Sequence, residues 1–359
     1  MMIELSRACI DHTRSLREAM TRMDASGLGI VLVLDPAGCL VGTITDGDVR
    51  RAILASVNLE VPVTELLARK AGSRYEKPIT APAGADRADY VRLLKERKIL
   101  HLPIVDATGR VVELVTLDEF FPDAVLPLHA IVMAGGAGTR LHPLTESTPK
   151  PMLPIGDQPL LEITIGRLRE AGIKHVKITT HHKPEKIAAH FGDGSGFGVE
   201  MAYVSEDRPL GTVGGLGLLA IPTETTLVIN GDILTQVDFR AMLNYHREHE
   251  ADLTVAVRRQ EQHVPYGIIE SDGPMVRRLR EKPSSTFFVN AGIYLLEPMV
   301  YHHIPAGQRF DMTDLIQRLL DHGRPVASFP VHEYWMDIGQ HADYQLAQEH
   351  AKQWAAPAK

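Results

Sequence analysis

The sequence predicts an α/β protein in two parts, a pair of α+β repeats followed by a larger α/β domain. The chain has 359 residues, which is longer than a typical single domain. An internal repeat lies near its start, and the remainder alternates strand-like and helix-like segments. We place the repeats at residues 1–122, a linker at 123–128 and the larger domain at 129–359.

The repeat is a helix followed by a strand, an Asp/Gly turn and a second strand. The two copies are offset by 71 positions, so that Asp35 and Gly38 in the first correspond to Asp106 and Gly109 in the second. Apolar runs of strand length on both sides of such a turn predict a hairpin. The predicted helices are 15–25 and 87–98, and the predicted strands are 30–34, 40–45, 102–105 and 111–116.

A second pattern begins after Pro122 and Pro127, which mark the predicted linker. Strand-like and helix-like segments then alternate, and such alternation predicts parallel strands joined by helical crossovers. The segments are strand 130–133, helix 160–171, strand 175–179 and helix 183–191.

Composition and charge exclude several classes of function. The 38 basic and 45 acidic residues give a net charge of −7, and aromatic residues make up only 6%, so we expect no nucleic-acid partner. No apolar run reaches membrane length, and no basic segment followed by an apolar one opens the chain. Cys9 and Cys39 fit neither a disulfide framework nor a zinc pattern. We therefore expect a cytoplasmic protein with no membrane association.

A glycine-rich turn follows the strand 130–133. Gly135, Gly136 and Gly138 allow a tight bend that brings backbone N–H groups close to an anion. Arg140 can bind two phosphate oxygens, and Lys150 adds a second positive charge. The turn lacks the closing residues of a Walker loop and the third glycine of the dinucleotide fingerprint.

Two carboxylates follow strand-like segments further along the chain. Asp232 comes after the apolar run 226–229 and Asn230-Gly231, and Asp337 comes after Tyr334-Trp335-Met336. Paired carboxylates at strand ends suit Mg²⁺, a hard ion that prefers oxygen ligands. The alternative for Asp232 alone is an ordinary turn aspartate.

Six sequence blocks together resemble the sugar-1-phosphate nucleotidyltransferases, the family of the mannose-1-phosphate guanylyltransferases and glucose-1-phosphate thymidylyltransferases. The resemblance implies a Rossmann-like α/β fold with a mixed central sheet, and a site above the carboxyl ends of its strands. The blocks are MAGGAGTRLHPLTESTPKPMLPI at 133–155, Pro209-Leu210-Gly211-Thr212, Asn230-Gly231-Asp232, Glu281-Lys282-Pro283, Asn290-Ala291-Gly292 and Trp335-Met336-Asp337-Ile338-Gly339.

The resemblance also implies a reaction and roles for residues. A sugar 1-phosphate attacks the α-phosphorus of a nucleoside triphosphate, and pyrophosphate leaves. Arg140 would hold the pyrophosphate, Lys150 the phosphates near the reacting centre and Lys282 the sugar phosphate. The alternative for Lys282 is a solvated surface lysine. Asp232 and Asp337 would bind Mg²⁺. The nucleotide would contact Ala134, Gly135, Gly136, Gly138, Thr139, Glu206, Pro209, Gly211 and Thr212, and the sugar would contact Tyr266, Gly267, Glu281 and Asn290.

The sequence specifies the nucleotide base and the sugar less closely than it specifies the reaction. Glu206 precedes a Pro-Leu-Gly-Thr loop that resembles that of guanylyltransferases, and one carboxylate can accept both N1–H and N2–H₂ of guanine, which favours GTP. The resemblance also suggests a hexosamine 1-phosphate acceptor and a role in surface glycan synthesis. The alternatives are a uridylyl- or thymidylyltransferase, and a catalytically silent nucleotide-sensing scaffold. The presence of all five charged site residues favours an enzyme.

The N-terminal repeats resemble a tandem pair of CBS domains. The motifs are GTITDGD at 42–48 and ELVTLDE at 113–119, which imply that Thr45 with Asp48, and Thr116 with Glu119, hold the ribose of an adenine or guanine nucleotide. Glu113 departs from the usual glycine. The alternative is that Thr45 ends a strand and Asp48 caps the next helix. Because paired repeats of this kind commonly associate with another copy, we expect a homo-oligomer.

Overall fold

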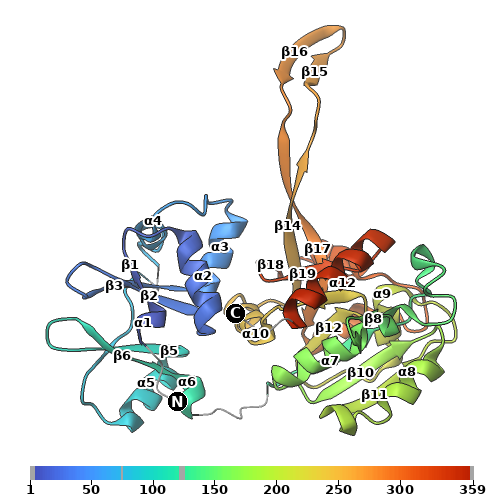
Figure 1. Ribbon diagram of the computed structural model, residues 1–359, viewed down its shortest axis with the longest axis horizontal. Coiled ribbons are helices and arrows are strands. Elements are labelled where there is room, and N and C mark those ends of the chain that lie inside the picture. Colours follow the sequence, from blue (N-terminus) through green and yellow to red (C-terminus); the bar gives the residue numbers. More distant parts are fainter. Residues whose placement is uncertain (1–4, 74–75, 121–125, 356–359) are drawn as a thin grey trace. The chain divides into compact units, whose positions relative to one another are not determined.

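The computed structural model describes residues 5–73, 76–120 and 126–355, and the chain divides into two compact units, 1–124 and 125–359 (Figure 1). Residues 123–125 of the predicted linker lie outside the described residues. Among the residues described, no helix has both the length and the apolar character needed to cross a bilayer.

The first unit contains two three-stranded sheets with the same topology. In each sheet the first strand runs parallel to the second, and the third runs antiparallel to it. The first sheet and its helices are α1 (Leu5–Ala8), β1 (Cys9–Asp11), α2 (Leu16–Ser26), β2 (Ile30–Leu34), β3 (Leu40–Thr45), α3 (Asp46–Leu54) and α4 (Val63–Ala68). The second comprises β4 (Ala81–Pro82), α5 (Arg87–Arg97), β5 (His101–Val105), β6 (Val111–Thr116) and α6 (Leu117–Phe120).

Structural details confirm the repeat that the sequence predicts. Each hairpin has a register shift at the same place, Val33/Leu34 in one and Ile104/Val105 in the other. The Oδ1 atoms of Asp35 and Asp106 each accept two backbone N–H bonds within the following turn. A backbone bridge joins the two turns at Cys39 and Arg110, which are again 71 positions apart. The halves therefore pack as a pseudo-symmetric pair.

Thr45 and Asp48 form a capping box at the start of α3, as the alternative from the sequence predicts. The Thr45 hydroxyl accepts from the Asp48 N–H, and Asp48 Oδ2 accepts from the Thr45 N–H at 2.9 Å. The same carboxylate pairs with Lys70 at 2.9 Å and with Arg51 at 2.7 Å. Burial, the largest single effect, raises the pKa of Asp48, but Lys70 and the Thr45 N–H together lower it below its usual value. Nucleotide binding at this pair stays a prediction.

The second copy differs at the equivalent positions. Thr116 is buried at the end of β6, but α6 has only four residues. Glu119 lies 3.5 Å from Arg87, and its side chain is 23% exposed, against 4% for Asp48. Burial raises the pKa of Glu119, and Arg87 opposes that shift. The Glu119 carboxylate is therefore more exposed, and paired at a longer distance, than the Asp48 carboxylate.

A seven-stranded mixed sheet in the order β11-β10-β7-β12-β17-β14-β18 forms the centre of the second unit. β17 is antiparallel to both of its neighbours, and the remaining adjacent pairs are parallel. The strands of this sheet are β7 (His129–Met133), β10 (His175–Thr180), β11 (Glu200–Ser205), β12 (Thr226–Asn230), β14 (Leu253–His263), β17 (Ser284–Leu296) and β18 (Val326–Val331). Smaller pairs are β8 (Pro154–Ile155) with β9 (Gln158–Pro159), and β13 (Ile233–Thr235) with β19 (Trp335–Asp337).

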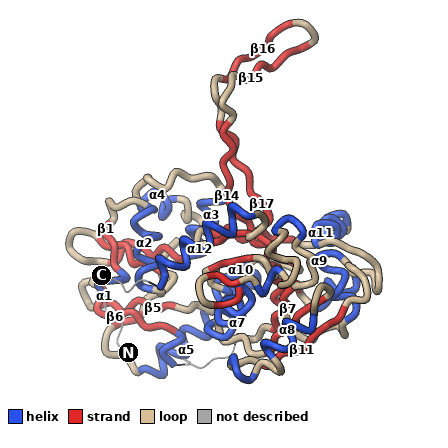
Figure 2. Tube along the Cα trace, turned by 45° about the vertical axis from the view of Figure 1, so that its right-hand side comes forward, coloured by secondary structure: helices blue, strands red, loops and turns tan. Residues whose placement is uncertain are grey.

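Helices cover both faces of this sheet, because its strands are apolar on both sides. Ala130 and Val132 of β7 lie in the cluster that includes α7, α8 and α10, whereas Ile131 lies in the opposite cluster with α9 and α11. The result is a three-layer α/β/α unit (Figures 1 and 2). The helices are α7 (Leu160–Glu170), α8 (Pro184–Phe191), α9 (Gly211–Gly214), α10 (Phe239–Glu248), α11 (Met312–Asp321) and α12 (His341–Ala355), with 3-10 turns η1 (Thr139–Leu141), η2 (Lys150–Met152), η3 (Ser195–Phe197), η4 (Gly215–Leu218) and η5 (Pro298–His303).

A long two-stranded ribbon projects from this sheet. β14 and β17 continue past the end of β18, and a second hairpin, β15 (Ile268–Asp272) with β16 (Met275–Arg280), lies at the far end of the ribbon (Figures 1 and 2). We call residues 259–288 the arm.

The capping box predicts an asymmetric response of the two repeats to mutation. Asp48→Ala leaves Lys70 buried without its partner and removes a helix cap, so it should lower the free energy of unfolding of the first unit by about 3 kcal/mol. The matched change Glu119→Ala should cost less than about 1 kcal/mol, because an exposed ion pair contributes little. Hydrogen exchange of α3 and α5 amides in the full chain under increasing urea measures both. Equal costs would contradict this account.

Candidate active site

Four parallel strands end at one edge of the large sheet, and a polar segment follows each of them. Met133 at the end of β7 lies in register with Thr179 of β10 and Asn230 of β12. The glycine-rich turn follows β7, His181 follows β10, and Asp232 comes two residues after β12. Glu206 follows β11. The site that the sequence predicts is therefore assembled at the carboxyl edge, as in other open α/β sheets.

The glycine-rich turn is fixed by bonds at both of its ends. The buried Ala134 donates its N–H to the Thr179 carbonyl at 2.9 Å, and the Thr145 hydroxyl donates to the Gly138 carbonyl at 2.9 Å. Gly138 has φ +64°, and a Cβ there would lie 3.0 Å from Cβ of Lys150. A side chain would therefore be strained and would press on Lys150. Gly136 is exposed, and a Cβ there meets nothing within 4 Å.

Lys150 and Asp232 form a short ion pair across the site. The Lys150 Nζ atom lies 2.5 Å from Oδ2 of Asp232, and Lys150 is only 8% exposed. Asp232 is more open, so its carboxylate can still reach a ligand. A buried ammonium needs such a partner, because desolvation without compensation is costly. The pair therefore holds Lys150 in the site.

Asp337 completes an acidic pair with Asp232. β13 and β19 pair with Ile233 opposite Asp337, and the Ile338 N–H donates to the Asp232 carbonyl at 3.0 Å. Burial and then the charge of Asp232 raise the pKa of Asp337, while Lys150 and Arg140 oppose the shift. Two neighbouring carboxylates in this electrostatic environment fit a divalent cation with oxygen ligands. Asp232 and Asp337 are the residues that would hold it.

Glu206 is buried against the glycine-rich turn. It is 7% exposed, its Oε2 accepts from the Leu210 N–H at 3.1 Å, and its own carbonyl contacts Nδ1 of His181 at 2.8 Å. A Cβ on Gly135 would lie 3.7 Å from both carboxylate oxygens of Glu206. The carboxylate therefore sits beside the turn, where it can accept from a ligand bound there.

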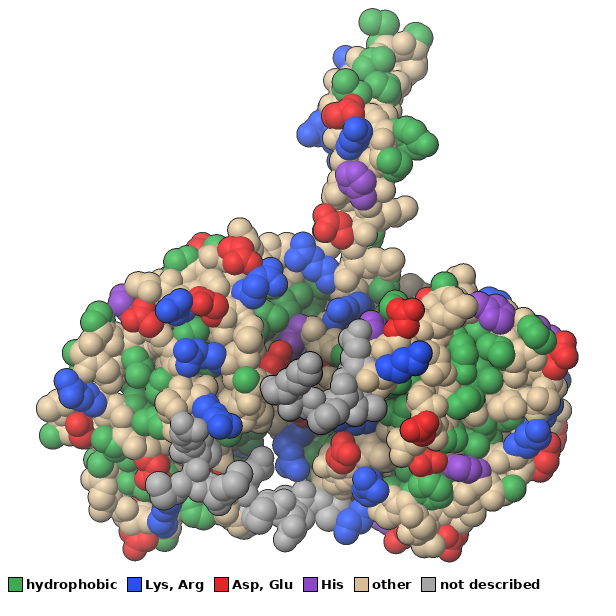
Figure 3. Space-filling view, viewed as in Figure 1, with side chains coloured by type: hydrophobic (Ala, Val, Ile, Leu, Met, Phe, Trp, Pro, Cys, Tyr) green, Lys and Arg blue, Asp and Glu red, His purple; other side chains and the backbone are tan. Residues whose placement is uncertain are grey.

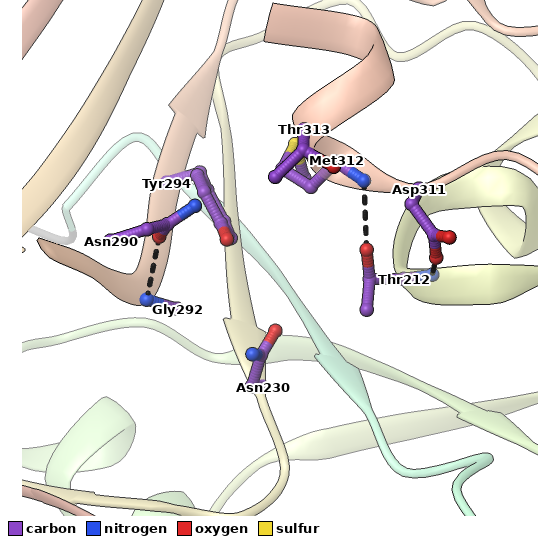
Figure 4. Close-up of a pocket in the computed structure, with 8 residues that line it drawn as sticks. All are labelled: Thr212, Asn230, Asn290, Gly292, Tyr294, Asp311, Met312 and Thr313. Carbon is purple, nitrogen blue, oxygen red and sulfur yellow. Dashed lines mark hydrogen bonds between the residues drawn. The ribbon is translucent and has the colours of Figure 1, made fainter.

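A cavity of about 270 Å³ opens next to these groups (Figure 4). Asn290 accepts from the Gly292 N–H at 2.9 Å on one wall. Thr212 accepts from the Met312 N–H at 2.8 Å on the opposite wall. Asn230 lies between the walls, and its Oδ1 atom is buried with no hydrogen-bond partner among the described residues. The lining consists of Thr212, Asn230, Asn290, Gly292, Tyr294, Asp311, Met312 and Thr313.

Two cavity residues have interactions that constrain them. Asp311 Oδ1 accepts from the Thr212 N–H at 3.0 Å, and its carboxylate lies 3.5 Å from Arg309. Burial raises the pKa of Tyr294 to about 12, an effect that Asp232 reinforces and a hydrogen bond with Asn290 opposes. Tyr294 therefore stays protonated and can donate into the cavity.

The structure brings most of the predicted site residues to this edge. The glycine-rich turn, the acidic pair, Lys150 and Glu206 meet there with Thr212 and Asn290. Arg140 is exposed on η1, and its Nη1 atom would lie 3.8 Å from a Cβ on Gly339, near the Asp337 carboxylate. Pro209 and Gly211 lie in the loop and the short helix that carry Thr212.

Four predicted residues lie elsewhere. Tyr266, Gly267, Glu281 and Lys282 are exposed on the arm, and Lys282 has φ +41°. The structure does not bring them to the cavity of their own chain, and their roles toward a sugar phosphate stay predictions.

Sequence reasoning also missed cavity residues. Asn230 belongs to the Asn-Gly-Asp block, so the sequence does carry a motif that points to it. Asp311 and Tyr294 carry no local signal, because Asp311 meets Thr212 from 99 residues away and Tyr294 lies within an apolar strand.

Comparison with known proteins identifies two families along the chain. The profile of the nucleotidyl transferase family matches residues 129–353, and that of the CBS domain matches residues 6–55. The second repeat lies outside the CBS match, although it has the same strand order as the first.

Two curated relatives match about three fifths of this chain. A mannose-1-phosphate guanylyltransferase from Mycobacterium tuberculosis is 36% identical over 224 residues, covering 60% of this chain and 62% of the relative. A UTP–glucose-1-phosphate uridylyltransferase from Synechocystis is 33% identical over 241 residues, covering 61% and 62%. The chain thus spans about three fifths of the length of these relatives.

A solved structure is similar over the same region. It is a crystal structure described as a putative glucose-1-phosphate thymidylyltransferase from Bacillus anthracis, with a TM-score of 0.52 and 25% identity. The match covers 65% of this chain and 98% of that one. It is consistent with the mixed-sheet architecture of the second unit.

The glycine-rich turn predicts different costs for two neighbouring substitutions. Gly138→Ala should lower the free energy of unfolding by about 2 kcal/mol, because it combines a left-handed backbone with pressure on Lys150 and Thr145. Gly136→Ala, in open space, should stay within about 1 kcal/mol of the wild type. Urea unfolding of the full chain, monitored by hydrogen exchange of β7 and β12, measures both. Indistinguishable costs would contradict the geometry described.

Proposed function

Because the chain belongs to the nucleotidyl transferase family and carries an N-terminal CBS domain, we propose that it transfers the nucleotidyl group of GTP to a sugar 1-phosphate. The products are a GDP-sugar and pyrophosphate. The observation that carries the proposal is the meeting of the glycine-rich turn, the Lys150–Asp232 pair and a polar cavity at one sheet edge.

The chain supplies charge and position for this reaction. An oxygen of the sugar phosphate forms a bond to the α-phosphorus of GTP, and the bond from that phosphorus to the oxygen of the β-phosphate breaks. Backbone N–H groups of the glycine-rich turn bind the triphosphate, and Arg140 binds the departing pyrophosphate. Lys150 neutralises the oxygens around the α-phosphorus, where charge is redistributed in the transition state. The attacking phosphate is already an anion, so no general base is required.

Asp232 and Asp337 are proposed to hold Mg²⁺ in the working enzyme. When bound there, the ion supplies electrostatic neutralisation of the phosphate oxygens. The chain's own contribution is to keep the two carboxylates close together although burial and then the charge of Asp232 raise the pKa of Asp337. Lys150 is placed to exchange its partner Asp232 for a phosphate oxygen of the substrate.

Glu206 supports guanine as the base. Its buried carboxylate lies beside Gly135 and can accept both N1–H and N2–H₂ of guanine. Adenine offers no such pair of adjacent donors, and a pyrimidine offers a single N3–H. Burying a carboxylate oxygen without a hydrogen-bond donor costs free energy. Bases that lack these donors should therefore bind less tightly than guanine.

The cavity supports a sugar with polar substituents. Asn230, Asn290 and Thr212 offer hydrogen-bonding groups on three sides, and Asp311 adds a carboxylate. A carboxylate binds an ammonium group more strongly than a neutral hydroxyl. We therefore propose a hexosamine 1-phosphate as acceptor, with the product serving glycan assembly.

Asp232→Asn should keep the shape of the side chain but remove a negative charge. We expect turnover with GTP, sugar 1-phosphate and Mg²⁺ to fall at least about a hundredfold, or about 2.7 kcal/mol of barrier. The exposed Asp193, changed to Asn, is the matched control and should leave turnover unchanged. Pyrophosphate release at limiting Mg²⁺ is the measurement. Near-normal turnover of the Asp232 variant would exclude the assigned role.

GTP should be the preferred nucleotide, and Glu206→Gln should reduce the preference over ATP, because it turns one acceptor into a donor. We expect a reduction of at least about tenfold in the ratio of kcat/KM values. The neighbouring exposed Asp207, changed to Asn, should leave that ratio as it is. Pyrophosphate release with GTP, ATP, UTP, dTTP and CTP provides the data. A wild-type preference for a pyrimidine nucleotide would overturn guanine as the base.

A further inference from the structure

Four ionisable side chains form a row at the amino edge of the large sheet, at the opposite ends of the strands from the candidate active site. We call them the edge row, and they are Glu200 of β11, His175 of β10, His129 of β7 and Glu224, which lies two residues before β12. His175 is in register with Glu200, and His129 is in register with Thr226 of β12. Neighbouring strands lie about 4.8 Å apart, so these side chains are neighbours across the sheet.

The members of the edge row contact one another in pairs. Nδ1 of His175 lies 3.0 Å from Oε2 of Glu200, and Nε2 of His129 lies 3.8 Å from Oε2 of Glu224. Between these pairs the two imidazole rings are adjacent, with their centres 5.0 Å apart and their planes inclined by 42°. The side chains of His175 and His129 are 53% and 43% exposed, and Figure 3 shows histidine side chains at the surface of the second unit. An ion in solution can therefore reach both rings.

Each carboxylate leaves one ring nitrogen of its histidine available. Nε2 of His175 and Nδ1 of His129 have no hydrogen-bond or ion-pair partner among the residues that the structure describes. A carboxylate beside one ring nitrogen favours the proton on that nitrogen and leaves the lone pair on the other. Histidine ligands in metal sites are oriented by carboxylates in the same way. The two histidines are therefore prepared to donate a lone pair each.

The separation of the two rings fits one shared ion. Two imidazoles that bind one tetrahedral Zn²⁺, with Zn–N distances of about 2.0–2.1 Å, have ring centres about 5 Å apart. The ring centres of His129 and His175 have this separation. All four members of the edge row are described, and no three of them have ligand atoms that all lie within 4.8 Å of one another. The histidines, rather than the carboxylates, therefore match an ion held between the rings.

The charges on this face of the sheet favour a cation. Two residues further along each strand, the four positions next to the edge row are Ala202, Lys177, Ile131 and Val228. Lys177 is the one charged residue of these four. The two glutamates of the edge row therefore set two negative charges against one positive charge.

A second pair of histidines lies in the opposite electrostatic environment. The rings of His303 and His322 have centres 5.3 Å apart. Burial, and after it the neighbouring positive charges, lower the pKa of His303. Two of these charges belong to Arg324 and Arg318, which would repel a cation. This pair is therefore a matched control for the edge row.

We propose that His129 and His175 bind one Zn²⁺ ion between their rings. Glu200 and Glu224 orient the two histidines and compensate the charge of the ion. Imidazole nitrogen suits Zn²⁺, whereas Mg²⁺ prefers oxygen ligands, so this site differs chemically from the acidic pair at the opposite edge. The ion joins the first residues of two neighbouring strands and stabilises the amino edge of the sheet. The site does not depend on the proposed function.

Calorimetric titration of the metal-free full chain with Zn²⁺ tests the site. An excess of Mg²⁺ is present, so that sites with oxygen ligands alone are occupied. His129→Gln combined with His175→Gln should remove one bound Zn²⁺ per chain. His303→Gln combined with His322→Gln should bind as much Zn²⁺ as the wild type. A wild type that binds no Zn²⁺, or an unchanged stoichiometry in the first double variant, would overturn the proposal.

The glutamates are tested by the same titration. Glu200→Gln combined with Glu224→Gln should weaken Zn²⁺ binding at least about tenfold without changing its stoichiometry, because the two histidines remain as ligands. The exposed Glu185, changed to Gln, is the matched control and should leave the affinity unchanged. Either an unchanged affinity or complete loss of the ion in the double variant would contradict an orienting role.

Hydrogen exchange locates the ion without reference to activity. Under native conditions, in which amides at the sheet edge exchange by local opening, Zn²⁺ should slow exchange at the first residues of β7 and β10 at least about tenfold. The double variant of His129 and His175 should exchange like the metal-free wild type with or without Zn²⁺, which also shows that it is folded. Zn²⁺-dependent protection confined to β13 and β19 would place the ion at the acidic pair and refute the proposed site.

Discussion

The ion pair between Lys150 and Asp232 is the interaction on which the candidate site of the second unit depends. It joins the segment after the glycine-rich turn to the segment after β12, and it keeps a nearly buried ammonium compensated. Gly138 has to be glycine because Lys150 passes 3.0 Å from where a Cβ would be. Removing the charge of Asp232 would leave the nearly buried Lys150 ammonium without compensation, so the pair orders this part of the site.

The backbone reinforces this connection at the carboxyl edge of the sheet. The Gly231 N–H donates to the Met133 carbonyl at 2.8 Å, and a Cβ on Gly231 would lie 2.9 Å from that oxygen. Only glycine permits so close an approach between the chain after β12 and the end of β7. The glycine-rich turn and Asp232 are therefore held together both by charge and by backbone contact. This explains why the two segments behave as one site although about a hundred residues separate them.

Sequence patterns predicted the parts of this protein that are specified locally. The runs 30–34, 40–45 and 111–116 are strands as predicted, and the CBS match and the nucleotidyl transferase match confirm the two families. What could not be predicted is the direction of the arm, because hairpin pairing within 259–288 is the same whether the ribbon lies on its own unit or leaves it. Motif matching placed Lys282 at the site, whereas the structure places it on the exposed arm, because a motif specifies chemistry and not the position of a side chain in the fold.

In the proposed reaction several positive charges gather around phosphate, and the ion pair of Lys150 suits this arrangement. Two ammonium groups held close together with no anion between them repel each other, and the repulsion is larger where water is excluded. Lys150 avoids this cost by pairing with Asp232 inside the fold. In the proposed reaction Lys150 can exchange Asp232 for a phosphate oxygen, so its charge is compensated both before and after the substrate binds.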